Sequence, residues 1–451
     1  MHETTAAAKY KMMTTAPVER LVVRMAVPTI TIMMISAMYN MADTYFVAFL
    51  GTSATAAVGI AFSLMAIIQA AGFFFGHGTG NFISRALGSQ NAEGAGKMAA
   101  TGLVSAFAAG ACIAVFGVIF LSPLARLLGS TDTILPYARD YLRFILPAAP
   151  FMVSSLMLNN LLRYQGSAFL GMIGMVSGAI MNAGLDPLFI FVFRMGVQGA
   201  ALATMISQTL SCVLLFVLGR KGRGNVRILF RGFSPSLASY KEMLRGGLPS
   251  LLRQGIASLA AVLLNHAAGA YGDAVIAAMS IVNRIFLLAS SAIVGFGQGF
   301  QPVCGFNYGA KRCDRVKKAF RFCICLSTAA LVILAAACFI YAPDIISLFR
   351  KDDAEVIAVG TLALRAECFV FPLLGWILMA GFLLQTMGKA FPASVLAFSR
   401  QGLFLIPLLF IAVPSFGVLG IQLCTPVADF CTFLLSLPLG ITALRRDLAE
   451  Q

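Results

Sequence analysis

Charged residues are scarce in this chain. Asp, Glu, Lys and Arg supply only 11% of its 451 residues, whereas hydrophobic residues supply 59%. A soluble globular chain carries roughly 25% charged residues, which cover its surface. So few charges exclude a water-soluble protein with a large core. The composition instead predicts an all-α polytopic membrane protein.

Several patterns of soluble and secreted proteins are missing as well. The ten cysteines include no CxxC pair, so neither a disulfide framework nor a cysteine metal site is indicated. No GK[ST] follows the glycine clusters, which argues against a phosphate-binding loop. The N-terminus is polar, and the first apolar run after Arg24 has no plausible cleavage site. We therefore expect no secretory signal.

Twelve apolar runs are long enough to span a bilayer, which takes about 20 residues per helix. Polar breaks separate these runs from one another. They cover residues 22–45, 54–83, 97–121, 138–160, 168–192, 197–219, 244–269, 275–303, 318–341, 357–384, 391–412 and 417–441. The sequence therefore predicts twelve transmembrane helices.

The net charge of +15 comes from basic residues in alternate loops. In a soluble chain this excess would suggest nucleic acid, a partner that we do not expect here. If the N-terminus is cytoplasmic, the cytoplasmic loops hold Arg163, the bases from Arg220 to Arg245, and those from Lys311 to Arg321. This asymmetry follows the positive-inside rule. It predicts a multi-pass protein of the cytoplasmic (inner) membrane, surrounded by lipid, with both termini cytoplasmic. The sequence does not give the oligomeric state, and a monomer is the default expectation.

The chain repeats itself at an offset of 221 residues. Pro28 then aligns with Pro249, and Gly78 with Gly299. Each unit holds six helices, so both halves cross the membrane in the same direction, and their pseudo-two-fold axis should follow the membrane normal. Such repeats suggest two lobes that rock about a central cavity. The predicted parts are an N-lobe at 1–219, a cytoplasmic linker at 220–243 and a C-lobe at 244–451.

Polar residues form stripes on three helices of the N-lobe, although an acid inside lipid costs several kcal/mol unless something holds it there. Spacings of three and four residues place each stripe on one helix face. The members are Ser36, Asn40 and Asp43 on the first helix, Asn182 and Asp186 on the fifth, and Thr204, Gln208 and Ser211 on the sixth. Their oxygens suit a Na⁺ ion. They also suit a proton, because desolvation and mutual repulsion favour protonated carboxylates.

Each acid also has an interpretation without a functional role. Asp43 could lie at the membrane interface, and Asp186 could lie at a helix end before Pro187. The repeat favours a site, because Asp43 aligns with Leu264 and Asp186 with Pro407. A device that serves packing alone should recur in both lobes. The acids therefore indicate an ion site that is confined to the N-lobe.

Two further residues are secondary candidates for a polar or substrate cavity. Asp429 aligns with Gln208 and is the acid that the repeat places in the C-lobe. His77, within GHGTG, could titrate near neutral pH, although a lone histidine is more often a hydrogen-bonded structural residue. The remaining charged residues within the runs are expected to form structural pairs between helices. These are Arg253, Arg284, Glu367 and Arg400.

Several motifs resemble the multidrug and toxic compound extrusion (MATE) family, and specifically its DinF-like branch. They include MYNMADTYFVAFLGTSATAAVGI, ISRALGSQN, LLRYQGSAF, MNAGLDPLFIF, GVQGAALAT and GFQPVCGFNYGAKRCDRVKKAF. They cover nearly the whole chain in the expected order. The resemblance implies two six-helix lobes, an outward-facing V-shaped cavity, and export of organic cations or other amphipathic compounds in exchange for H⁺ or Na⁺.

The resemblance also implies a set of site residues. The cation site of that branch matches Asp43, Asn182, Asp186 and Thr204, and its helix-kinking proline matches Pro28. The NorM-like branch instead relies on acids in helices 7 and 8. This chain has Gln254 and Asn283 near those places, which argues against a C-lobe cation site of that kind.

The first hypothesis is therefore a secondary active multidrug exporter, which is no enzyme and needs no cofactor beyond its coupling ion, H⁺ or Na⁺. Its substrate would be a small-molecule drug or organic cation. An alternative is a lipid or lipid-linked sugar flippase, which should carry cationic cavity residues for phosphate. A third reading, an intramembrane aspartyl protease using Asp43 and Asp186, would need a GxGD-type motif that neither acid has.

Overall fold

The computed structural model describes residues 2–220, 226, 232–349 and 353–448, and the side chain of Asn40 lies outside the described residues. In this part of the chain, twelve helices are long and apolar enough to cross a membrane. Each overlaps one of the twelve predicted runs. The all-α class and the number of spans are therefore confirmed.

The described spans fall into two halves of six each. Those of the first half are α2 (Val18–Ala48), α3 (Thr52–Gly88), α4 (Ala92–Ile119), α6 (Leu135–Tyr164), α7 (Ala168–Pro187) continued by the wider π-helical turn η1 (Leu188–Val192), and α8 (Gly196–Arg220). Those of the second half are α9 (Leu237–Gly269), α10 (Asp273–Gly309), α11 (Cys313–Ile340), α13 (Ala354–Thr386), α14 (Ala390–Phe398) continued by η3 (Ser399–Leu405) and α15 (Ile406–Phe416), and α16 (Val418–Thr442) continued by η4 (Ala443–Asp447).

The structure adds elements that hydropathy did not predict. They are three short helices, α1 (His2–Thr15), α5 (Leu121–Leu127) and α12 (Ala342–Phe349). Moreover, α9 begins at Leu237, inside the predicted linker, because Ser236 caps it by accepting a hydrogen bond from the Ser239 amide at 3.1 Å. Residues 221–225 and 227–231 of that linker lie outside the described residues.

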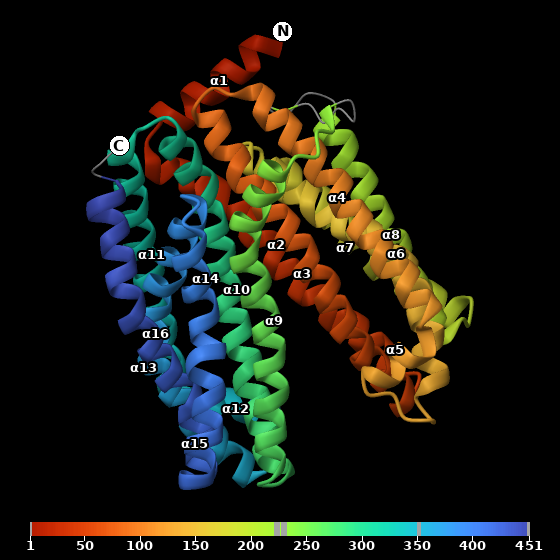
Figure 1. Cartoon of the computed structure of the whole chain (residues 1–451). Coiled ribbons are helices and arrows are strands. Elements are labelled where there is room, and N and C mark those ends of the chain that lie inside the picture. Colours follow the sequence, from red (N-terminus) through yellow and green to blue (C-terminus); the bar gives the residue numbers. More distant parts are fainter. Residues whose placement is uncertain (1, 221–225, 227–231, 350–352, 449–451) are drawn as a thin grey trace.

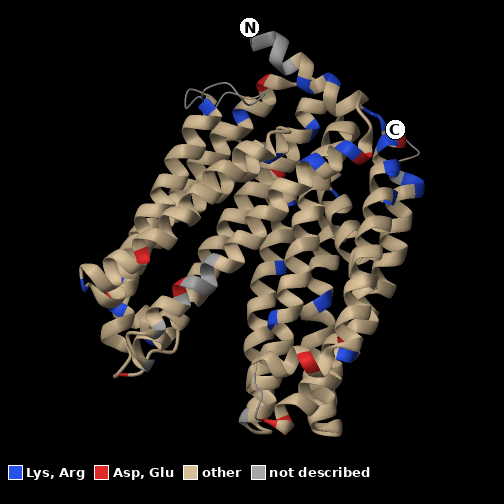
Figure 2. Ribbon diagram, turned by 180° about the vertical axis from the view of Figure 1, so that it is seen from behind, with Lys and Arg blue, Asp and Glu red and all other residues tan. Residues whose placement is uncertain are grey.

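The helices form two groups that diverge from one end of the molecule (Figure 1). Helices α2 to α8 make one group, the N-lobe, and α9 to α16 make the other, the C-lobe. Both chain termini lie at the end where the two lobes converge. We call this the terminal end and the opposite one the far end. Lys and Arg gather at the terminal end (Figure 2). This distribution is the one that the positive-inside rule places in the cytoplasm, so the predicted orientation of the termini keeps its support.

The two groups meet through four helices that the repeat relates in pairs. Helix α3 packs on α9, and α2 packs on α10. Gly78 and Gly299, which the 221-residue offset aligns, lie at these two contacts. A Cβ atom on Gly78 would lie 2.3 Å from the Met243 carbonyl oxygen, and one on Gly299 would lie 2.4 Å from Ala26 Cα. Only glycine allows the helix backbones to approach so closely.

Replacing Gly299 with leucine should therefore separate the groups at the terminal end. We expect Gly299→Leu to destabilise the described arrangement by about 1–3 kcal/mol, the usual cost of overpacking, and to lower the melting temperature of the purified protein. The matched control is Gly255→Leu, since a Cβ there meets nothing within 4 Å. Equal melting temperatures for the two variants would contradict this role.

Helix α1 joins both groups at the terminal end. Three side chains near the end of α10 and the start of α11 donate hydrogen bonds to backbone carbonyl oxygens in the last turn of α1 and just after it. Asn307 Nδ2 donates to Met13 O (3.1 Å), Arg312 Nη1 to Thr14 O (3.2 Å) and Arg315 Nη2 to Ala16 O (2.5 Å). On the other side Lys9 Nζ donates to Ser167 Oγ at 2.7 Å, between α6 and α7. The polar N-terminus therefore packs as a structural element.

Burial lowers the pKa of Lys9 to about 8, whereas lysine in an unfolded chain titrates near 10.4. Between these values the unfolded state binds more protons, so the contribution of Lys9 to stability rises with pH. We expect the melting temperature of the wild type, relative to Lys9→Met, to rise from pH 7 to pH 10. Lys11→Met, at an exposed position of α1, should follow the wild type. A pH-independent difference for Lys9→Met would contradict the assignment.

Candidate functional site

The four residues of the predicted ion site come together inside the N-lobe. Asp43 lies on α2, Asn182 and Asp186 on α7, and Thr204 on α8, and these helices pack on one another. None of the four side chains is more than 1% exposed. Asp43 lies five residues before the end of α2, so the group occupies the half of the lobe toward the far end.

Asn182 links the other polar groups of α7 and α8. Turned so that both neighbours are satisfied, its amide nitrogen donates to Asp186 Oδ2 at 3.0 Å. Its oxygen then accepts from Thr204 Oγ1 and from the Thr204 backbone amide, both at 3.3 Å. The spacing of four residues between Asn182 and Asp186 produces this contact, since it places them on one face of α7. The helix continues past Asp186 through Pro187 into η1, so Asp186 does not mark a helix end.

Asp43 is less completely bonded. Tyr141, on α6, donates its hydroxyl to Asp43 Oδ2 at 3.4 Å, while Oδ1 has no hydrogen-bond partner among the described residues. Asp43 and Asp186 are close enough to interact electrostatically. Sequence reasoning missed Tyr141, because it belongs to no polar stripe and only the tertiary fold brings it to the acid. The free oxygen of Asp43 is available to an ion or a proton.

Within the described part of the chain, the two acids have no cationic partner. None of the ion pairs between described residues includes Asp43 or Asp186. A buried, unpaired carboxylate costs several kcal/mol, which is removed if a proton or cation neutralises it. Carboxylate, amide and hydroxyl oxygens are the hard ligands that Na⁺ or another hard cation would use. The arrangement is chemically suited to taking up and releasing a positive charge.

The remaining N-lobe candidates lie around this group. Ser36 and Gln208 are half-buried on α2 and α8. On α8 it is Ser211 that faces α7, since its Oγ donates to the Gly174 carbonyl oxygen at 2.8 Å. Pro28 is buried within α2, which continues through it without interruption.

The C-lobe acid is in a different electrostatic situation. Arg400 donates to both oxygens of Asp429, at 2.5 Å from Nε and 3.0 Å from Nη2, and its guanidinium lies 4.7 Å from the centre of the Phe286 ring. Glu367 lies nearby, 5% exposed, and interacts electrostatically with both. Asp429 is thus neutralised by an arginine, whereas the N-lobe acids have no counterpart.

His77 belongs to a second polar group, which joins the two lobes. Its Nδ1 lies 2.6 Å from Ser250 Oγ on α9, and Gln385 Nε2 on α13 donates to the same Oγ at 2.8 Å. Gln301 on α10 donates to Gln385 at 3.4 Å. His77 is fully buried, so its place is at the interface between lobes.

Arg163 completes this inter-lobe cluster, which we define as His77, Arg163, Ser250, Gln298, Gln301 and Gln385. Arg163 Nη1 donates to the Gln298 carbonyl oxygen across the interface at 2.5 Å, and Nη2 donates to Asn160 Oδ1. The sequence placed Arg163 in a cytoplasmic loop, which is wrong, because it lies in the last turn of α6 and is 2% exposed. A charge count cannot distinguish a loop base from one buried at a helix end.

The family can now be stated. The MatE family model matches residues 28–188 and 249–411 of the chain, so the chain belongs to the MatE family. The two matched stretches begin at Pro28 and Pro249, which the internal repeat aligns. The protein is accordingly a multi-pass membrane transporter of a multidrug efflux family and not an enzyme.

Particular relatives agree in length and fold. The multidrug export protein MepA of Staphylococcus aureus is 26% identical over 93% of this chain and 94% of its own. A crystal structure of MATE in complex with MaL6 superposes with a TM-score of 0.92 at 26% identity, covering 98% of this chain and 99% of the other. The outward-facing conformation of a multidrug resistance MATE family transporter of the MOP superfamily gives 0.90 at 27% identity, covering 97% and 98%.

Proposed function

We propose that this transporter exports organic cations or amphipathic drugs in exchange for H⁺ or Na⁺, and that Asp43, Asn182, Asp186 and Thr204 bind the coupling ion. One observation supports the proposal most strongly: two acids are buried next to each other, and no ion pair between described residues includes either of them. Such a pair is stable in this packing only when it is neutralised. Export by relatives such as MepA, a multidrug export protein, supports the class of substrate.

Helix α2 can transmit the effect of ion binding to the lobe interface. This helix carries Asp43 near its far end and contacts α10 near its terminal end, where Gly299 meets Ala26. Pro28 lies between the two points. Proline removes one backbone hydrogen bond from a helix, which makes it a natural place to bend. When the charge on the acids changes, repulsion and hydration of the carboxylates would move α2, and the bend would transmit the movement.

Alternating access then requires the terminal end to open and close. The described arrangement keeps it closed by the glycine contacts and by the inter-lobe cluster. A ligand shifts such an equilibrium only as far as its affinities for the two states differ. The coupling ion meets this condition. It binds tightly where the acids are buried, and it binds weakly in a state where water reaches and solvates them.

Removing the charge of one site acid should uncouple export from the ion gradient. In proteoliposomes with pH and Na⁺ gradients imposed separately, we expect Asp43→Asn and Asp186→Asn to lower gradient-driven export of a fluorescent cation about 5- to 150-fold, the usual range of coupling between linked sites. Asp132→Asn is the control, since Asp132 is an exposed acid paired with Arg126. Export by Asp43→Asn at the wild-type rate would refute the proposed site, and the effective gradient identifies the ion.

Arg163 offers a test of the closed terminal end. Arg163→Lys keeps a buried positive charge and its desolvation cost, but it gives up the planar fork that reaches Gln298 and Asn160 together. We expect it to destabilise the closed state by about 1–3 kcal/mol. The measurement is the distance between spin labels at the exposed positions 93 and 321 on α4 and α11.

Arg245→Lys serves as the matched control, because Arg245 forms a half-exposed pair with Glu242 on the same side of the molecule. It should leave the distance distribution unchanged. If Arg163→Lys also leaves it unchanged, the inter-lobe cluster does not hold the terminal end closed.

A further inference from the structure

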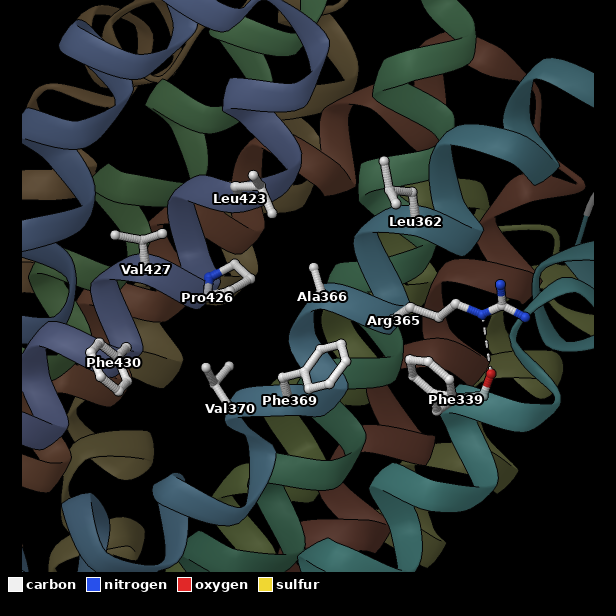
Figure 3. A pocket seen from close by; sticks show the side chains of 10 residues that line it. All are labelled: Phe339, Leu362, Arg365, Ala366, Phe369, Val370, Leu423, Pro426, Val427 and Phe430. Carbon is white, nitrogen blue, oxygen red and sulfur yellow. Dashed lines mark hydrogen bonds between the residues drawn. The ribbon is translucent and has the colours of Figure 1, made fainter.

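The outer face of the C-lobe carries two adjoining hollows, and Figure 3 shows the residues that line the larger of them. The larger, about 550 Å³, lies between α13 and α16 and reaches α11, and the smaller, about 460 Å³, lies between α13 and the segment around α12. Leu362 and Arg365 line both of them. Because they share these two residues, we call the two hollows together the C-lobe groove, with Arg365 between them.

This groove faces the membrane. Three of the helices that form its walls, α11, α13 and α16, are long and apolar enough to span it, while Pro343 of the smaller hollow belongs to the short helix α12. Phe369 is 74% exposed, and Phe430, on the facing wall, is 49% exposed. Side chains of this kind are stable outside the protein core only in contact with lipid. An arginine on such a surface is costly unless its charge reaches the headgroups or an anion.

The depth of Arg365 follows from its partner on α11. Arg365 Nε donates to the Phe339 carbonyl oxygen at 3.2 Å, and the guanidinium lies 5.2 Å from the centre of the Phe339 ring. Phe339 is the penultimate residue of α11. Residues 322–340 contain no charge, and at 1.5 Å per residue they span about 28 Å, close to the thickness of the hydrocarbon layer. Arg365 therefore lies where hydrocarbon meets headgroups, at the far end.

The two hollows differ in chemistry on either side of that arginine. Toward the middle of the membrane, the larger hollow is lined by apolar side chains such as Ala366, Leu423 and Val427. Toward the far end, the smaller hollow is lined by Thr361, whose buried Oγ1 has no hydrogen-bond partner among the described residues. The hydrogen bond to α11 uses Nε of Arg365, which leaves its two Nη groups for another acceptor.

We propose that the C-lobe groove binds a phospholipid of the leaflet at the far end, the outer leaflet in the predicted orientation. Its phosphate binds the Nη groups of Arg365, which match phosphate oxygens in a two-point contact. One acyl chain fills the larger hollow against Ala366 and Leu423. Charge complementarity and the apolar continuation select this occupant over a soluble anion. The site is separate from the ion site, which lies in the other lobe.

Native mass spectrometry of the delipidated full chain with added phosphatidylglycerol tests the proposal. We expect Arg365→Gln to lower the bound fraction of this lipid by about tenfold, the effect of losing one charged contact, and Arg365→Lys to lower it less. Ala366→Trp, which keeps the arginine but fills the larger hollow, should also reduce binding. Diacylglycerol with the same chains and inorganic phosphate alone should bind poorly.

The matched control is Arg126→Gln, which removes an exposed arginine at the end of α5, in the other lobe. It should bind the lipid as the wild type does. Equal binding by Arg365→Gln and Arg126→Gln overturns the proposal. So does binding that Ala366→Trp leaves unchanged, or a dimer that the groove variants dissociate while lipid binding persists, because a second copy would then be the occupant.

Discussion

The uncompensated pair Asp43 and Asp186 is the constraint on which the rest of the account depends. A membrane protein can bury an acid cheaply by pairing it with a base, and the C-lobe does so with Arg400 and Asp429. Within the described part of the chain, the N-lobe acids accept hydrogen bonds from Tyr141 and Asn182, which with Thr204 are all neutral. Their charge must therefore be balanced by something that comes and goes. In the proposed mechanism, this difference between two related lobes makes the N-lobe the part that responds to the coupling ion and the C-lobe its fixed counterpart.

The connection between that switch and the whole molecule follows from the position of α2. It contributes an acid to the proposed ion site, a proline about a third of the way along its length, and a backbone surface against Gly299 of the other lobe. If α2 bends at Pro28, a change of charge at Asp43 can therefore alter the contact between α2 and α10 at the lobe interface. The inter-lobe cluster and α1 lie at the same terminal end. Their contacts keep the two lobes together at the terminal end, and a shift of α2 would have to break them.

Much of this structure could be predicted from the sequence, for identifiable reasons. Twelve spans follow from hydropathy, and the contact of Asn182 with Asp186 follows from helical spacing, because both depend on neighbours along the chain. Tyr141 at Asp43, Arg400 at Asp429 and the burial of Arg163 depend on which helices pack together, which local patterns do not encode. Helix α1 was missed for a related reason. It is polar, and donors more than 290 residues away stabilise its end.

The most direct measurement of the central claim is the inter-lobe distance at the terminal end as a function of the coupling ion. Spin labels on the two lobes would be followed while pH or Na⁺ concentration is varied, in the wild type and in the double variant Asp43→Asn, Asp186→Asn. If Asp43 and Asp186 bind the coupling ion, one of these ions shifts the wild type between two inter-lobe distances, whereas the double variant keeps a single distance. A shift of the same size in the double variant would contradict it, because the ion would then act elsewhere.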